Sequence, residues 1–203
     1  MFKTTLLAVA LLGAVQANAA LVVNTGTPAD SGFPLSLDGN DWLAGQVSFS
    51  QALTINSIKG WLNDGVDGPG GETFTVSLYS DASNSVASLL DSATGQFVTA
   101  QGVSDWNGAS NLNWSVGPGK YWVALEVQGD DSFDGAAPIG APSPLARYAF
   151  NDGGFSGYQA LTGDAFGIQV DATVAAVPEP ATGSMLLLGM GLMGFMARRR
   201  QSR

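Results

Sequence analysis

The chain has 203 residues, of which 17 are acidic and 8 basic, giving a formal net charge of −9. All of the acids except Glu179 lie between positions 30 and 171, where Lys59, Lys120 and Arg147 supply the basic charge. Such a surface repels phosphate backbones, which excludes nucleic acid as a partner. The chain has no histidine and no cysteine, so Ser-His-Asp and Cys-His catalysis, the common zinc sites and disulfides are excluded.

Residues 1–19 predict a cleaved signal peptide. Lys3 gives a positive start, residues 6–15 are apolar, and Ala17 and Ala19 form the small-x-small pattern that signal peptidase accepts. We expect cleavage after Ala19. An uncleaved N-terminal anchor is the alternative, but it would need a longer apolar run.

Residues 20–176 are expected to form one domain with its own core. The stretch 73–79 alternates strictly, with Phe74, Val76 and Leu78 on one face, as in a half-buried antiparallel strand. Similar short runs occur at 21–24, 46–50, 57–62, 96–100, 111–116, 121–128, 146–150 and 166–173. Turn signals rich in Asn, Asp, Gly and Pro separate them. This spacing predicts an all-β fold, an antiparallel β-sandwich that is jelly-roll-like.

Three stretches fit the strand pattern less well. Residues 83–91 could be a helix or a loop, and residues 129–145, with three prolines, predict a long rim loop. Trp106 precedes Asn107-Gly108, a turn signal, and is therefore expected in a loop that caps one end of the sandwich.

Several motifs of the domain occur together in a known pattern: Trp-Leu-Ala at 42–44, Val-Ser-Phe at 47–49, Phe-Thr-Val-Ser-Leu-Tyr-Ser at 74–80, Leu112 and Gly-Lys-Tyr-Trp-Val-Ala-Leu at 119–125. On these residues the domain resembles the choice-of-anchor family of β-rich ectodomains. It implies a sandwich fold displayed at a surface. It transfers no catalytic residue.

Tyr121 and Trp122 are adjacent, so a strand must point them to opposite faces. If Tyr121 faces the core, Trp122 points outward on the same side as Glu126. An exposed indole beside a carboxylate could serve as a sugar-binding platform. The other interpretation is that a loop covers Trp122 and that the second sheet face is a minor core. Trp61 raises the same question as a possible carbohydrate contact.

Two acidic loops have a composition that can bind calcium. One contains Asp64 and Asp67, and the other contains Asp130, Asp131 and Asp134, each with glycines for tight turns. Neither completes a twelve-residue EF-hand loop. A solvated acidic turn is the alternative for both loops. Calcium is the one cofactor that the sequence suggests.

The C-terminal segment 177–203 has three parts. Pro178 and Pro180 keep the first part extended and accessible to a protease. Residues 181–197 carry no charge, and as a helix they would reach about 25 Å, which just spans a bilayer core. The arginines that follow hold the C-terminus on the cytoplasmic side, so the preceding domain lies outside. These arginines are Arg198, Arg199 and Arg200.

This tail resembles the PEP-CTERM sorting signal of Gram-negative bacteria. The resemblance rests on Val177, Pro178, Glu179 and Pro180, the short apolar helix and the arginines. It implies recognition by an exosortase, which cuts near the Pro-Glu-Pro element after transient anchoring in the inner membrane. It also implies a final place at the cell surface or outside the cell, typically in bacteria that make exopolysaccharide. An ordinary C-terminal anchor is the alternative.

Several functions follow from these observations. The first is a non-catalytic surface or matrix protein associated with exopolysaccharide or biofilm. The second is a carbohydrate-binding module that uses an outward tryptophan. A polysaccharide-active enzyme is a weaker alternative, because the domain has only Glu72 and Glu126 as glutamates. Ice binding is suggested by the tail alone, and a regular threonine array is absent.

Overall fold

The computed structural model describes residues 19–29, 34–64, 71–100, 102–163, 166–174 and 189–190. Its compact unit spans Ala17–Ala175. The predicted signal peptide up to residue 18, Asp67, the Pro-Glu-Pro element, the arginines and all but two residues of the expected 181–197 helix lie outside the described residues. Ala19 begins the first strand and pairs with Thr173. Within the described residues, no helix is long and apolar enough to cross a membrane.

The described part of the chain contains twelve strands, and every pairing between them is antiparallel. The strands are β1 (Ala19–Asn24), β2 (Leu35–Leu37), β3 (Asp41–Phe49), β4 (Leu53–Leu62), β5 (Thr73–Ala82), β6 (Ser85–Gln96), β7 (Asp105–Val116), β8 (Gly119–Glu126), β9 (Gly135–Ala137), β10 (Tyr148–Asp152), β11 (Gln159–Leu161) and β12 (Ile168–Val174). The predicted all-β antiparallel fold is confirmed.

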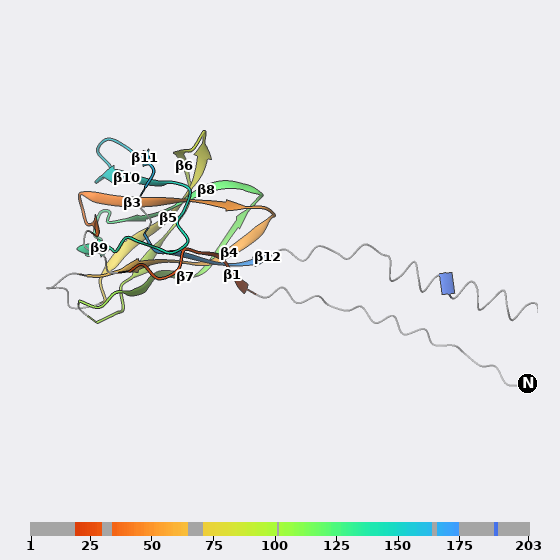
Figure 1. The fold of residues 1–203 in the computed structure, drawn as a ribbon, viewed down its shortest axis with the longest axis horizontal. Helices are drawn as coiled ribbons and strands as arrows, with labels where there is room; N and C mark the ends of the chain where they lie inside the picture. Colours follow the sequence, from red (N-terminus) through yellow and green to blue (C-terminus); the bar gives the residue numbers. More distant parts are fainter. Residues whose placement is uncertain are drawn as a thin grey trace, which may run out of the picture. The chain divides into compact units, whose positions relative to one another are not determined.

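Ten strands form one curled sheet in the order β1-β12-β4-β7-β6-β5-β8-β3-β10-β11, and β2 pairs with β9 in a small second sheet (Figure 1). β6 and β7 are joined only through the pair Gln96 and Gly108, so the large sheet divides there into two halves. The two halves curl toward each other and enclose the core, as the layers of a sandwich do.

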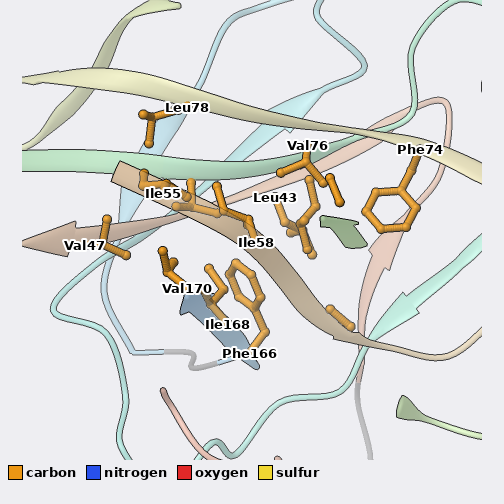
Figure 2. Close-up of a cluster of buried hydrophobic side chains, with 14 of the residues drawn as sticks. Leu43, Val47, Ile55, Ile58, Phe74, Val76, Leu78, Phe166, Ile168 and Val170 are labelled. Atoms are coloured by element: carbon orange, nitrogen blue, oxygen red, sulfur yellow. The ribbon is translucent and has the colours of Figure 1, made fainter. Parts of the chain in front are cut away.

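The main core forms between these halves. Phe74, Val76 and Leu78 of β5 are fully buried, as their alternation predicts. They belong to the same cluster as Ile58 of β4 and Val170 of β12, and Figure 2 shows these side chains between the strands. Because apolar residues of both halves meet here, burial of this cluster is what holds the sheet in its curled form.

The three stretches that fit the strand pattern poorly in the sequence lie partly in strands. Residues 83–91 are neither helix nor loop: most of them belong to β6, which pairs with β5 from Thr73 to Ala82. Ser83 and Asn84, with φ of 54° and 64°, form the two-residue turn whose twist suits a hairpin. The 129–145 loop contains the short strand β9, and Trp106 lies in β7 rather than in a loop.

Candidate functional site

Trp122 points away from the main core, as alternation predicts, but its side chain is 0% exposed. It packs with Ala44, Ala124 and Ala149 in a second apolar cluster, which partly buried residues cover. The covering residues are Tyr79, Val86, Tyr158 and Ala160. The prediction of an outward sugar-binding Trp122 is therefore wrong, and the alternative of a minor core on the second face is correct.

The indole of Trp122 is also fixed by a hydrogen bond. Its Nε1–H donates to Oδ1 of Asp81 at 2.8 Å. Burial acts to raise the pKa of Asp81, but hydrogen bonds from Asn84, Gln46 and Trp122 outweigh it and lower that pKa. The second cluster is thus closed by polar contacts at its edge, where β5 turns into β6.

Glu126 is likewise inside the protein, at 0% exposed. Its Oε1 accepts hydrogen bonds from the hydroxyls of Tyr79 at 2.8 Å and Tyr158 at 2.6 Å. Its Oε2 accepts from Ser77 at 2.6 Å and from the side-chain amide of Gln128. We call these five residues the Glu126 cluster. Since both carboxylate oxygens are occupied by protein donors, Glu126 is not available as a sugar contact.

The Glu126 cluster changes the acidity of its two tyrosines. Burial, and then the negative charge of Glu126, raises the pKa of Tyr79 and of Tyr158 well above the ordinary value. Their rings also pack edge to face, with centroids 5.7 Å apart. The cluster therefore links β5 and β8 to the segment before β11 through hydrogen bonds and ring packing together.

Trp61 stays partly exposed and packs against another tryptophan. It lies opposite Trp106 in the β4–β7 register, and the two ring centroids are 5.3 Å apart with planes at 69°. Edge-to-face packing of this kind holds both indoles in place. Trp61 is thus the one predicted carbohydrate contact that has a solvent-accessible side chain.

A groove with a volume of about 400 Å³ lies where β6 and β7 separate. We call it the β6–β7 groove. It is lined by Lys59, Thr94, Gln96, Val98, Trp106, Asn107, Gly108, Ala109, Ser110 and Asn111. Its lining combines one partly exposed indole with amides, hydroxyls and an ammonium group, which is the mixture that can recognise a polar ring with apolar faces.

Asn107 builds the edge of this groove. Its Oδ1 accepts hydrogen bonds from the Val98 N–H at 2.9 Å and the Thr99 hydroxyl at 3.1 Å, and its Nδ2 donates to the Asp105 carbonyl at 3.0 Å. The Asn107-Gly108 pair was interpreted as a turn signal, but it lies within β7 and allows β7 to approach β4 closely. A Cβ on Gly108 would lie 2.1 Å from the Ile58 carbonyl oxygen. The groove was therefore missed because its signal was attributed to a loop.

The described acidic residues of the two predicted calcium loops differ in their surroundings. Asp130 and Asp134 are exposed, whereas Oδ2 of Asp131 accepts hydrogen bonds from Thr75 at 2.7 Å and the Gln128 N–H at 3.1 Å. Asp64 is buried. Among the residues that the structure describes, no three acidic side chains form a group that could hold a metal ion.

Comparison with known families assigns the C-terminal segment. The PEP-CTERM protein-sorting motif matches residues 176–200, which confirms the resemblance drawn from the prolines, the apolar segment and the arginines. No curated protein matches the chain. The motif implies export, processing by an exosortase and sorting to the cell surface. The match begins after the last strand of the β-domain and does not concern the domain's ligand.

Proposed function

We propose that this exported, PEP-CTERM-sorted chain is a non-catalytic protein of the cell surface or matrix that binds exopolysaccharide in the β6–β7 groove. The sorting motif supplies the destination. The observation that supports a ligand is the composition of the groove, where the partly exposed Trp106 lies among polar side chains.

The groove fits a sugar better than an apolar ligand. An indole can stack on the C–H face of a sugar ring, while amides such as Gln96 and Asn111 both donate to and accept from its hydroxyls. Its volume of about 400 Å³ lies at the lower end of small-molecule sites. Lys59 places a positive charge in the groove of a largely acidic protein. The acidic surface repels an anionic polymer, but at physiological salt charges more than about 8 Å apart are largely screened. Lys59 acts at contact distance, so we expect uronic-acid polysaccharides to bind in the groove more tightly than neutral ones.

A non-catalytic role is supported by the two glutamates of the domain. Glu126 is enclosed and has no oxygen free to act on a substrate, because four protein groups donate hydrogen bonds to its carboxylate. Glu72 is buried directly before the first residue of β5. Hydrolysis of a glycosidic bond requires a carboxylate pair that flanks the substrate. Neither glutamate lines the β6–β7 groove.

Replacement of Trp106 by Ala should weaken polysaccharide binding about tenfold, because loss of one stacking contact removes roughly 1–1.5 kcal/mol. The measurement is calorimetry of the full chain, in mild detergent, with a uronic-acid polysaccharide and a neutral one. Lys59→Met should reduce the preference for the acidic polymer without disturbing the tryptophan pair. Phe155→Ala is the matched control, since this ring is 95% exposed and lies outside the groove lining. Native affinity in the Trp106 variant would exclude the groove, and absence of binding by the native chain would exclude the function.

The route to the surface is part of the proposal. Signal peptidase would remove residues 1–19, the segment 181–197 would hold the chain transiently in the inner membrane, and an exosortase would act near Pro178 and Pro180. Replacing both prolines by Ala should leave uncut chain in the inner-membrane fraction, because a helix can then continue through the processing site. Immunoblots of cell fractions measure this, with Pro118→Ala in a surface turn as the control. Normal processing of the double variant would contradict the assignment of these prolines.

A further inference from the structure

Three chain segments meet at the end of the fold where β4 finishes and β5 begins. Asn63 and Ala136 exchange backbone hydrogen bonds of 2.9 and 2.8 Å, which fixes the β9 segment beside Asp64. A Cβ on Gly135 would lie 2.2 Å from the Asn63 carbonyl oxygen and 2.9 Å from the Asp64 Cα, so only glycine permits this approach. Asp134, the residue before it, is therefore held close to Asp64.

Glu72 is held at the same corner from the other side. Its carbonyl accepts a hydrogen bond from the Phe97 N–H at 2.9 Å. The carbonyl of the next residue, Thr73, accepts from the N–H groups of Ser132 and Phe133 at 3.1 and 3.0 Å. The Phe133 ring then packs into the core against Phe74 and Phe97. The segment 132–135 thus contacts the backbone next to both Glu72 and Asp64.

The two carboxylates are buried and incompletely satisfied. Asp64 is 2% exposed and Glu72 is 8% exposed. Oδ1 of Asp64 accepts the Gly102 N–H at 2.9 Å, but Oδ2 of Asp64 and Oε2 of Glu72 have no hydrogen-bond partner in the described part of the chain. Burial, and then the negative charges of Asp64 and Asp134, raises the pKa of Glu72. The charged groups that act on Glu72 are thus acidic, whereas Glu126 has a donor for each oxygen.

An unpartnered buried carboxylate is strongly unfavourable, and two neighbouring ones repel each other as well. Either a proton or a cation can relieve this arrangement. A proton shared between the two carboxyl groups would leave one negative charge buried, whereas a divalent cation offsets both negative charges at once. The donor set contains only oxygen, and the chain has no histidine or cysteine, which suits a hard cation rather than zinc or copper.

We propose that Asp64 and Glu72 bind a calcium ion in the exported protein. The ion is held by this pair, water and backbone oxygens complete its coordination, and Asp134 adds negative charge nearby. Calcium tolerates an irregular oxygen shell of six to eight ligands, while magnesium requires near-octahedral geometry. With only two carboxylates, the affinity should fall in the range of extracellular modules, about 0.1–1 mM. The proposal does not depend on polysaccharide binding.

The test is thermal unfolding of the full chain in mild detergent, with EDTA or with calcium chloride. At a calcium concentration about ten times the Kd, Tm should rise by about 3–6 °C, and the same concentration of magnesium chloride should raise it by less than half as much. Equal shifts with both salts would mean a general ionic effect and would overturn the proposal. So would a calcium-insensitive Tm that falls as the pH rises from 5 to 8, because that pattern indicates a shared proton.

Variants that remove a charge distinguish calcium binding by Asp64 and Glu72 from a purely structural role of these two side chains. Glu72→Gln and Asp64→Asn keep the size and shape of the side chains, and the Asn side chain retains an oxygen that can accept the Gly102 N–H. Both should raise Tm in EDTA by relieving repulsion and should lose the calcium response. Asp130→Asn, at an exposed neighbouring acid, should keep that response as the control. A calcium shift that survives in Glu72→Gln and Asp64→Asn would overturn the assignment to these residues.

Discussion

Above about pH 11 the native protein should lose about 2.7 kcal/mol of unfolding free energy per pH unit, and about half as much per unit at pH 10. The loss arises from Tyr79 and Tyr158, whose hydroxyls donate to Glu126 at 2.8 and 2.6 Å. Burial and then the carboxylate charge raise the pKa of both in the folded state. An unfolded tyrosine releases its proton near pH 10, so above that pH the folded state holds two protons that the unfolded chain has lost. This stabilisation is fully present below pH 10 and is lost as the pH rises.

The measurement is urea unfolding followed by tryptophan fluorescence from pH 8 to pH 12. In Tyr158→Phe the slope of the unfolding free energy against pH should fall to about 1.4 kcal/mol per pH unit, because only one of the two tyrosine hydroxyls remains. Tyr121→Phe is the matched control: its hydroxyl donates to the Gly117 carbonyl, and the variant keeps both tyrosines of the Glu126 cluster. If the native slope were no steeper than that of a Tyr79→Phe, Tyr158→Phe double variant, the cluster would not be the cause.

The fold was largely predictable because the main core lies on one face of regular strands. The alternation in 73–79 correctly placed Phe74, Val76 and Leu78 inside. The turn signal at Gly117-Pro118 correctly separated β7 from β8, whereas the one at Asn107-Gly108 lies within β7. β6 was not predicted. Its side chains are mostly exposed, so it shows little apolar alternation, and its position is set by backbone pairing with β5.

The candidate site was much less predictable than the fold. Alternation correctly placed Trp122 on the face away from the main core, but whether that face was covered depended on Tyr158 and Ala160, which are distant in sequence. The same holds for Glu126, whose donors come from β5, from residue 128 and from residue 158. The sorting tail was readable because its recognition rests on a local order of proline, apolar and arginine segments. Sites assembled by long-range packing carry no comparable local pattern.

Replacement of Trp122 by Ala should reduce the unfolding free energy by about 3–5 kcal/mol. Trp122 is fully buried among small side chains, with Ala44, Ala124 and Ala149 as neighbours in its cluster, so little else can fill the space that the indole leaves. The variant also removes the Nε1–H that donates to Asp81. For a protein of this size the loss corresponds to a fall in Tm of about 10 °C or more, measurable by circular dichroism.

Trp122→Phe provides an intermediate case, because it retains a ring in the cluster but lacks the donor to Asp81. Trp122→Phe should lose less than half as much unfolding free energy as Trp122→Ala. Its stability can be measured even if the alanine variant does not fold. Trp106→Ala is the control for removal of an indole, since Trp106 is partly exposed at the groove and should cost about 1–2 kcal/mol. A loss below about 1 kcal/mol for Trp122→Ala would mean that the indole is not enclosed in the folded protein. An exposed Trp122 would offer a second indole to a polysaccharide, apart from the Trp106 that lines the β6–β7 groove.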